Sequence, residues 1–496
     1  MSKFPSRLSP LAALGAAVLL AGCSMIPKYE RPAAPVADQY PTTSGWIAES
    51  AQTQATPNTP AAADIEWQAF FSDPQLRKLI DAALRNNRDL RIAVLNIEQA
   101  RAQYGIRRAD QFPTISAGIT GSRQPNANGN GSISSAYTGG LLMTSYELDF
   151  FGRVASLKEA ALAQYLATEE GRKTTQISLI AAVANTYLAL LADEELLAIT
   201  QQTLATREES LKLSKLRFNN GVTSELDYRQ AESVTEGARV ALAQQVRQRA
   251  LDQNALTLLL GQPLTGELAV ALPAGKGLSD APMMVDVPAG LPSDLLTRRP
   301  DVRQAEQQLL AANADIGAAR AAFFPRISLT ASAGSASSHL SGLFKSGSYG
   351  WTLAPQLILP LFDAGRNRAG LDSANAGRDI AVAQYEKSVQ TAFREVADAL
   401  AGRATLGEQL RAQQAQANSE ATRFKLADLR YQNGIASYLD QLDAQRALFA
   451  ARLAVVQTRL AQLQSQVTLY KTLGGGWKEP PPEEALSLKA DTQLSR

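Results

Sequence analysis

The chain has 496 residues, a formal net charge of +2, one cysteine and one histidine. The near balance of charge gives no reason to expect nucleic-acid binding. A Cys/His metal cluster and an internal disulfide are excluded, and no nucleophile–base set appears, so we predict neither an enzyme nor a cofactor.

The N-terminus predicts a lipoprotein signal. Lys3 and Arg7 precede an apolar run at residues 11–21, and the run ends in Leu20-Ala21-Gly22-Cys23. A basic start, a short apolar core and small residues at the cut are typical of a secretory signal peptide, here residues 1–22. The last four residues resemble the lipobox of bacterial lipoproteins, in which Cys23 receives acyl chains such as palmitate. An ordinary signal peptide that happens to contain a cysteine is the alternative.

The residues after Cys23 carry two further expectations. Position 24 is serine rather than the aspartate that retains lipoproteins at the inner membrane, which resembles outer-membrane sorting. We therefore predict a lipid-anchored N-terminal segment over residues 23–75, and we expect disorder in its Ala/Thr/Pro-rich stretch 50–63. No apolar run of 18 residues follows the leader, so the sequence predicts no membrane-spanning helix, and β-strands would have to make any crossing.

An internal repeat with a period of about 212 residues sets the domain organisation. Phe112-Pro113-Thr114-Ile115-Ser116 aligns with Phe324-Pro325-Arg326-Ile327-Ser328, and Leu216-Arg217-Phe218-Asn219-Asn220-Gly221-Val222 aligns with Leu429-Arg430-Tyr431-Gln432-Asn433-Gly434-Ile435 at an offset one residue longer. We predict a first repeat over residues 76–275 and a second over 276–476. The Pro-rich tail 477–496 is predicted to be disordered.

Each repeat predicts the same elements in the same order: a helix, two strands, a very long helix and a second helix. The expected ranges are 76–109, 113–124, 136–150, 154–219 and 225–260, and then 293–323, 325–338, 348–361, 366–432 and 437–473. Pro300 predicts a helix start inside the second set. Because neither long segment contains proline, we expect continuous helices of about 100 Å; ordinary bundle helices with kinks are the alternative.

The extended runs alternate apolar and polar residues, as membrane β-barrel strands do. A soluble four-stranded sheet beside a helical domain is the alternative interpretation. Four strands cannot close a membrane barrel, because the smallest such barrels have eight. The chain must then associate: a dimer gives eight strands with a filled lumen, and a trimer gives twelve, enough for a pore.

The motifs together resemble the TolC/OprM family of outer-membrane efflux factors, in its lipoprotein branch. The resemblance covers nearly all of the mature chain. It rests on Leu20-Ala21-Gly22-Cys23 with Ile26-Pro27-Lys28-Tyr29-Glu30-Arg31-Pro32, on Arg298-Arg299-Pro300-Asp301-Val302, on Phe324-Pro325, on Phe362-Asp363-Ala364-Gly365-Arg366, and on Tyr431-x-x-Gly434 leading to Leu439-Asp440-x-x-Asp443-Ala444-Gln445-Arg446.

That resemblance implies an α+β membrane protein that forms a homotrimer. A twelve-stranded β-barrel, with four strands per chain, would lie in the outer membrane, and a long periplasmic α-helical barrel would continue it. The implied function is the passive exit duct of a tripartite efflux system, which takes drugs or other small molecules from an inner-membrane transporter through a periplasmic adaptor. The alternatives are a structural coiled-coil lipoprotein without a pore, or the same duct serving protein or metal-ion export.

The resemblance also implies a periplasmic gate at the two Asn-Gly breaks. Asp440 and Asp443 are three residues apart and share a helix face, so a trimer would hold two rings of carboxylates. Tyr431 resembles a position that holds the tip shut, and Asp227 its partner on the neighbouring hairpin. Helix capping is the competing role for Asp440 and Asp227, but it does not explain Asp443. Ala436 stands where some members carry a basic locking residue, which leaves the closing network open. His339 is expected to be an exposed loop residue.

Overall fold

The structure, a computed structural model, describes residues 24–40, 61–125, 133–270, 272, 275–278, 284–288 and 294–477. The predicted signal peptide, Cys23, residues 478–496 of the tail and most of the Ala/Thr/Pro-rich stretch lie outside the described residues. The chain divides into two compact units. Unit 1 combines Leu95–Glu169 and Gln304–Lys387 with the N-terminal segment up to Ala34, and unit 2 combines Glu170–Arg303 and Ser388–Arg496 with Pro35–Val94.

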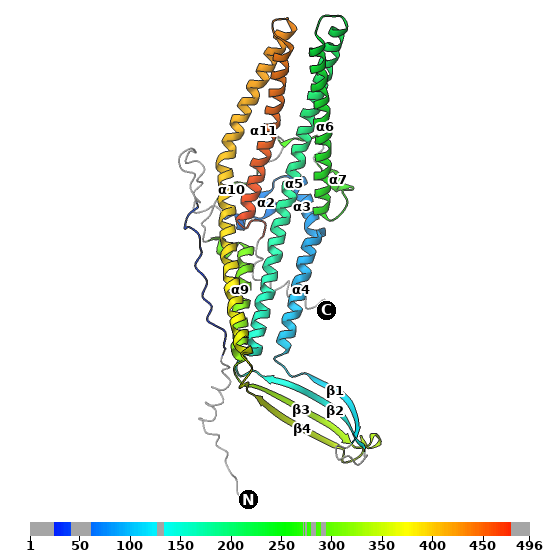
Figure 1. The fold of residues 1–496 in the computed structure, drawn as a ribbon, viewed down its shortest axis with the longest axis vertical. Coiled ribbons are helices and arrows are strands. Elements are labelled where there is room, and N and C mark those ends of the chain that lie inside the picture. The colour runs from blue at the N-terminus through cyan, green and yellow to red at the C-terminus, as the bar shows by residue number, and fades with distance from the viewer. Residues whose placement is uncertain are drawn as a thin grey trace. The chain divides into compact units, whose positions relative to one another are not determined.

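The main elements follow one order twice (Figure 1). The first set is α3 (Pro74–Asn86), α4 (Arg88–Ala109), β1 (Ile115–Pro125), β2 (Ile133–Leu148), α5 (Arg153–Asn219) and α6 (Glu225–Leu260). The second is α8 (Asp294–Arg298), α9 (Pro300–Ala321), β3 (Arg326–Ser337), β4 (Tyr349–Ile358), α10 (Arg366–Gln432) and α11 (Tyr438–Thr472). The short elements are η2 (Ala62–Asp64), α2 (Trp67–Phe70), α7 (Glu267–Val270) and η4 (Leu340–Gly342).

The long helices form as the sequence predicts. Both α5 and α10 are uninterrupted helices of 67 residues, and each ends at an Asn-Gly turn. Pro300 is the first residue of α9, where its missing N–H costs nothing and its fixed φ suits a helix start.

One predicted helix is wrong. Residues 76–109 form two helices, α3 and α4, rather than one, and the break is at Asn87. The backbone of Asn87 is extended, its Oδ1 accepts from the N–H of Leu90 at 3.0 Å, and its Nδ2 donates to the carbonyl of Leu259 at 2.9 Å. Asparagine therefore caps the second helix and contacts the end of α6 at the same time.

The strands of unit 1 form one antiparallel sheet in the order β1-β2-β3-β4. The register between β2 and β3 shifts between Met143 and Tyr146, where Ser145 has a φ of 50°, so a bulge bends the sheet near its helical end. Strand β4 ends at Ile358, earlier than the predicted 361, before Pro360. Pro355 lies inside β4, which is an edge strand of this sheet, where proline is tolerated.

A row of glycines crosses the whole sheet. The register pairs Gly118 with Gly140, Gly140 with Gly334, and Gly334 with Gly350. The two central strands approach closely here, because a Cβ atom on Gly140 would lie 2.4 Å from the carbonyl oxygen of Ala333. Only glycine fits these two central positions, whereas the two outer ones face open space.

Aromatic residues form part of the core of unit 2. The rings of Phe70 and Tyr470 stack with centroids 3.9 Å apart, and the hydroxyl of Tyr470 donates to the carbonyl of Ile65 at 2.6 Å. The buried Tyr187 of α5 donates to Asp73, the residue that caps α3, at 2.8 Å. The segment around α2 is thereby held against the helices α5 and α11.

One stretch of α5 meets the length and hydropathy criteria of a membrane-spanning helix, although the sequence predicts no such helix. A window of 18 residues in α5 has a mean hydropathy of 1.5, and 61% of it is buried inside the protein. Length and composition alone make it a candidate span, and a buried core helix passes the same test. Its apolar residues include the fully buried Val183, Ala184 and Tyr187, which fits a core role.

Candidate functional site

The two helical hairpins of unit 2 end in matching turns. In the first, Val222 donates its N–H to the carbonyl of Arg217 at 2.9 Å, and Gly221 has a φ of 67°. In the second, Ile435 donates to Arg430 at 2.8 Å, and Gly434 has a φ of 71°. Each glycine adopts the left-handed conformation that ends a helix, so the same local chemistry makes both turns.

Asp440 and Asp227 both bind the serine that caps the helix after their turn. Ser437 donates its backbone N–H and its hydroxyl to Asp440 Oδ2 at 3.1 and 2.8 Å, and these bonds hold the pKa of Asp440 below its ordinary value. Asp227 Oδ2 accepts from the hydroxyls of Thr223 and Ser224, both at 2.9 Å. The capping box is thus complete at Asp440, whose carboxylate is also exposed. Asp227 instead orients the hydroxyl of Ser224, the residue that caps α6.

Asp443 is held by an arginine. Its exposed carboxylate forms an ion pair with Arg423 of α10, which also contacts Glu420. These two carboxylates raise the pKa of Arg423, with the Asp443 hydrogen bond as the larger cause. The position that corresponds to Asp443 in the first repeat is Gln230, so this charge pair belongs to the second hairpin alone.

Tyr431 of the second hairpin contacts the guanidinium of Arg217 in the first hairpin. Nη1 of Arg217, at the end of α5, donates to the hydroxyl of Tyr431 at 2.9 Å, and the guanidinium lies 5.2 Å from the ring centroid. Tyr431 also packs against Tyr438, with ring centroids 5.6 Å apart. The hydroxyl of Tyr431 accepts from Arg217, while Oδ2 of Asp227 accepts from two hydroxyls of its own turn.

The sheet of unit 1 separates an apolar face from a polar one. Apolar residues whose side chains share one face are Ile115, Ala117, Ile119, Leu141, Met143, Leu329, Trp351, Leu353 and Leu357, and several of them are well exposed. The other face carries Thr120 and Thr138, whose hydroxyls are 2.6 Å apart, together with Ser332, Thr352 and the glycine row. This division matches strands that contact lipid on one side and water on the other.

The polar face ends in a bridged carboxylate. Glu147, near the end of β2, binds Arg153 through two hydrogen bonds of 2.8 and 2.7 Å, and its Oε2 also lies 2.8 Å from Nε of Arg326. One carboxylate therefore links the start of α5 to two adjacent strands.

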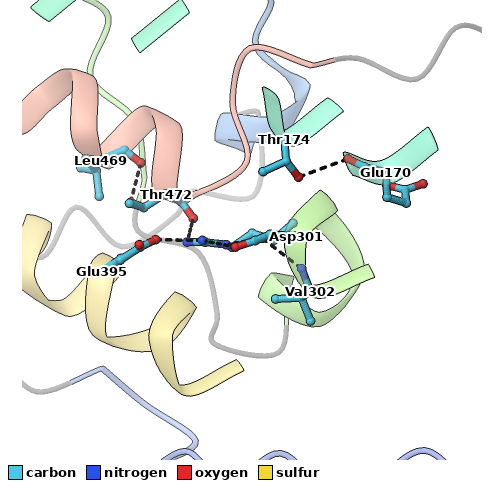
Figure 2. Close-up of polar contacts among 8 residues, drawn as sticks. Glu170, Thr174, Asp301, Val302, Glu395, Leu469 and Thr472 are labelled. Carbon is cyan, nitrogen blue, oxygen red and sulfur yellow. Dashed lines mark hydrogen bonds and ion pairs between the residues drawn. The ribbon is translucent and has the colours of Figure 1, made fainter. Parts of the chain in front are cut away.

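Arg299, from the Arg-Arg-Pro-Asp motif, forms a junction in unit 2 with Asp301, Glu395 and Thr472, the partners that Figure 2 labels. It is buried, binds Asp301 in a bidentate manner, contacts Glu395 of α10 at 2.8 Å and donates to the carbonyl of Thr472 at 2.9 Å. Burial lowers the pKa of its guanidinium, but the hydrogen bonds to Asp301 and Glu395 outweigh that effect and raise it. The junction ties the start of α9 to α10 and to the end of α11.

A carboxyl pair with one buried member, Asp193, lies between α5 and α6. Asp193 is buried, and its Oδ1 accepts from Nε2 of Gln245 at 2.9 Å. Burial raises the pKa of Asp193 to about 7, and the neighbouring Asp252 is the second cause of this rise. Arg249 lies nearby, but it forms an ion pair with Glu194. The pair therefore favours a shared proton over two charges.

Sequence reasoning singled out Asp440, Asp443, Tyr431 and Asp227 but missed their cationic partners. Arg217 stands directly before Phe218, the repeat counterpart of Tyr431, so its place beside the tip was visible in the alignment. Arg423 lies 20 residues from Asp443 and on another helix, a pairing that only the hairpin geometry reveals. His339 is exposed in the loop between β3 and β4, as predicted. No group of three or more His, Cys, Asp or Glu side chains suited to a metal occurs among the described residues.

Comparisons with known protein families, sequences and structures all match this chain to outer-membrane efflux proteins or channels, over most of its length. The family described as outer membrane efflux protein matches residues 79–262 and 291–475. The toluene efflux pump outer membrane protein TtgC of Pseudomonas putida is 49% identical over 468 residues, which are 93% of this chain and 94% of TtgC. Outer membrane protein OprJ of Pseudomonas aeruginosa is 46% identical, over 95% and 96% of the two chains. The open state of the Neisseria gonorrhoeae MtrE outer membrane channel superposes with a TM-score of 0.81 at 41% identity, and the match covers 92% of this chain and 99% of MtrE.

Proposed function

The chain belongs to the outer membrane efflux protein family, and from this premise we propose that it is the passive exit duct of a tripartite efflux system. Its fold, with one four-stranded sheet and two long helical hairpins per chain, is that of the outer-membrane efflux channels. It is a transport component of the outer membrane. The proposed partners are a periplasmic adaptor and an inner-membrane transporter that supplies the energy.

The observation that carries the proposal is the two-faced sheet with open edges. Among the described residues, β1 pairs only with β2 and β4 only with β3, so each edge offers a free row of backbone groups. Three copies joined edge to edge give twelve strands, enough to leave a pore, whereas a dimer would give eight with a filled lumen. The apolar face would contact lipid, and the polar face would line the lumen. We therefore propose a homotrimer.

We propose that the tips of the hairpins form the periplasmic gate. In a trimer Asp440 and Asp443 would each form a ring of carboxylates, which attract cations and repel one another. The ion pair with Arg423 neutralises the Asp443 ring, so cation binding would fall mainly to Asp440. The Arg217–Tyr431 contact would hold the hairpins together in the closed state and supply the cation that Ala436 lacks.

We further propose a lipid anchor at Cys23, with a large periplasmic extension below it. The support is the lipobox-like ending of the leader and the way in which the chain continues after it. Arg31 binds Glu306 of α9 through hydrogen bonds of 2.7 and 2.9 Å, Tyr29 donates to the same carboxylate at 2.9 Å, and Asn313 donates to the carbonyl of Pro27 at 2.8 Å. The segment 27–31 is therefore bound to α9 only a few residues after Cys23, as expected if the chain is anchored in the membrane at Cys23.

The cargo is proposed to be drugs or other small molecules, since the similar protein TtgC is named as part of a toluene efflux pump. Protein or metal-ion export through the same duct is the second transport reading, and the described residues offer no metal-binding cluster that favours it. A structural lipoprotein without a pore is the remaining competitor, and conductance separates it from both.

The test is single-channel conductance of the purified protein in a planar bilayer, with its mass measured in parallel. We expect a trimer with small, cation-selective openings. The double variant Asp440→Asn/Asp443→Asn, which keeps oxygen acceptors for the cap, should weaken block by divalent cations, and Arg423→Gln should strengthen it. Glu236→Gln, an exposed carboxylate on α6, is the matched control. A protein that never conducts, even as the double variant, would contradict the duct.

The anchor has its own test. Wild-type protein should incorporate labelled palmitate, and Cys23→Ala should not. Unchanged labelling of the variant would contradict the assignment of Cys23.

A further inference from the structure

The loop between β3 and β4, residues 338–348, lies against the apolar face of the sheet. Leu343 is 1% exposed although it belongs to a loop. A Cβ atom on Gly139 would lie 3.4 Å from Cδ2 of Leu343 and 3.4 Å from Cγ1 of Ile119. Leu343 therefore covers the glycine gap beside Ile119, on the face that carries Trp351 and Leu353.

Hydrogen bonds within the loop fix its shape. The hydroxyl of Ser348 donates to the carbonyls of Leu343 at 2.9 Å and Lys345 at 2.8 Å. The N–H groups of Leu343 and Lys345 donate to Leu340 at 3.3 Å and Gly342 at 3.1 Å. The loop is thus a compact turn tethered by one buried leucine, rather than an extended excursion.

The outer surface of this turn is apolar. Phe344 is 80% exposed and Leu340 is 62% exposed, on either side of the buried Leu343. The loop contains Lys345 and His339 but no carboxylate. Large apolar side chains left exposed next to an apolar sheet face need an apolar partner. Phenylalanine and leucine with a neighbouring lysine are typical of segments that lie in a membrane interface.

We propose that this loop is a membrane-interface anchor, in which Leu340 and Phe344 insert into the outer leaflet of the outer membrane and Lys345 remains at the level of its anionic headgroups. The inference rests on the proposed function, because it requires the apolar face of the sheet to contact lipid. Leu343 makes the loop continuous with that face. A loop folded over the lumen would instead lie on the face of Thr138 and Ser332.

The test measures the depth of spin labels in the full-length protein reconstituted into vesicles of phosphatidylcholine and phosphatidylglycerol, whose anionic headgroups attract basic side chains. Labels are placed singly at Phe344→Cys, Leu340→Cys, Leu353→Cys and Ser346→Cys. Accessibility to oxygen, which concentrates in lipid, is compared with accessibility to a water-soluble nickel chelate. Parent protein without an introduced cysteine, treated with the same spin-label reagent, reports any labelling of Cys23.

We expect the labels at 344 and 340 to be several-fold more accessible to oxygen than to nickel, as the label at 353 on the sheet face is. The label at 346, a polar position of the same loop, should favour nickel. In a Leu343→Ser background the loop loses its tether, and the label at 344 should shift toward nickel.

Each other outcome is informative. A label at 344 that favours nickel while the label at 353 favours oxygen overturns the anchor but leaves the barrel intact. A label at 344 inaccessible to both probes shows that the loop packs on a neighbouring subunit, which also overturns the anchor. If the label at 353 favours nickel too, the lipid-facing assignment of the sheet fails, and the proposed function with it.

Discussion

Replacing Tyr431 by phenylalanine should loosen the closed tip while leaving the ring in place. The variant removes the hydroxyl that accepts from Arg217 at 2.9 Å but keeps the aromatic face beside the guanidinium. A partly exposed hydrogen bond of this kind contributes about 1 kcal/mol. A loss of about 1 kcal/mol changes an equilibrium constant by a factor of about five. A trimer contains three such bonds, so their combined loss should raise the ratio of open to closed channels on the order of a hundredfold.

The assay is the open probability and conductance of single channels, with uptake of a large antibiotic by whole cells as a second measure. Tyr228→Phe is the matched control, because its hydroxyl contacts Glu232 of its own helix at 3.5 Å and does not join the hairpins. Arg217→Gln should resemble Tyr431→Phe, and the two together should add little. Additive effects, or an open probability for Tyr431→Phe equal to that of Tyr228→Phe, would refute the role of this contact.

Three further predictions concern stability. Asp193 has a folded pKa of about 7 against an ordinary value of 3.8, so the folded state holds the extra proton and stability should fall as pH rises between these values. Asp193→Asn, which mimics the protonated acid, should remove that fall and melt higher than wild type at alkaline pH; parallel melting curves for both would contradict this. Arg299→Met leaves two carboxylates and a carbonyl without this partner and should cost about 3–5 kcal/mol, seen as a lower melting temperature in detergent. The exposed Arg239→Met should leave the melting temperature almost unchanged, because solvent screens its ion pairs; equal shifts would argue against the junction. A Cβ atom on Gly334 would lie 2.3 Å from a backbone oxygen, so Gly334→Ala should abolish the folded oligomer on semi-native gels while Gly350→Ala, which faces open space, assembles; assembly of both would show that the close approach is unnecessary.

The helices and strands were predictable because each leaves a local signal. The long helices lack proline and stop at Asn-Gly, and the strands alternate with a period of two. The break at Asn87 was missed because asparagine is tolerated within helices, and its cap depends on the distant carbonyl of Leu259. The turn over the sheet at Leu343 was missed for a similar reason, since its buried position depends on a glycine some two hundred residues earlier in the chain.

The candidate site was predictable in its acids and less so in its cations. Asp440 and Asp443 could be placed on one helix face from their spacing alone. Their different environments, a cap for one and an ion pair for the other, arise from Ser437 in the adjacent turn and from Arg423 across the hairpin. Capping could be read from Ser437-x-x-Asp440, but the ion pair required the packing of α10 against α11, which spacing does not encode.

The glycine row bears on where an exported molecule is sorted. In the proposed trimer, Gly118, Gly140, Gly334 and Gly350 of three copies would form a continuous band of bare peptide backbone around the lumen. At that level the wall offers a passing molecule no charge, no hydroxyl and no ring to distinguish it from another. The barrel would then contribute little selectivity at this level, and selection among exported molecules would have to occur before they reach it.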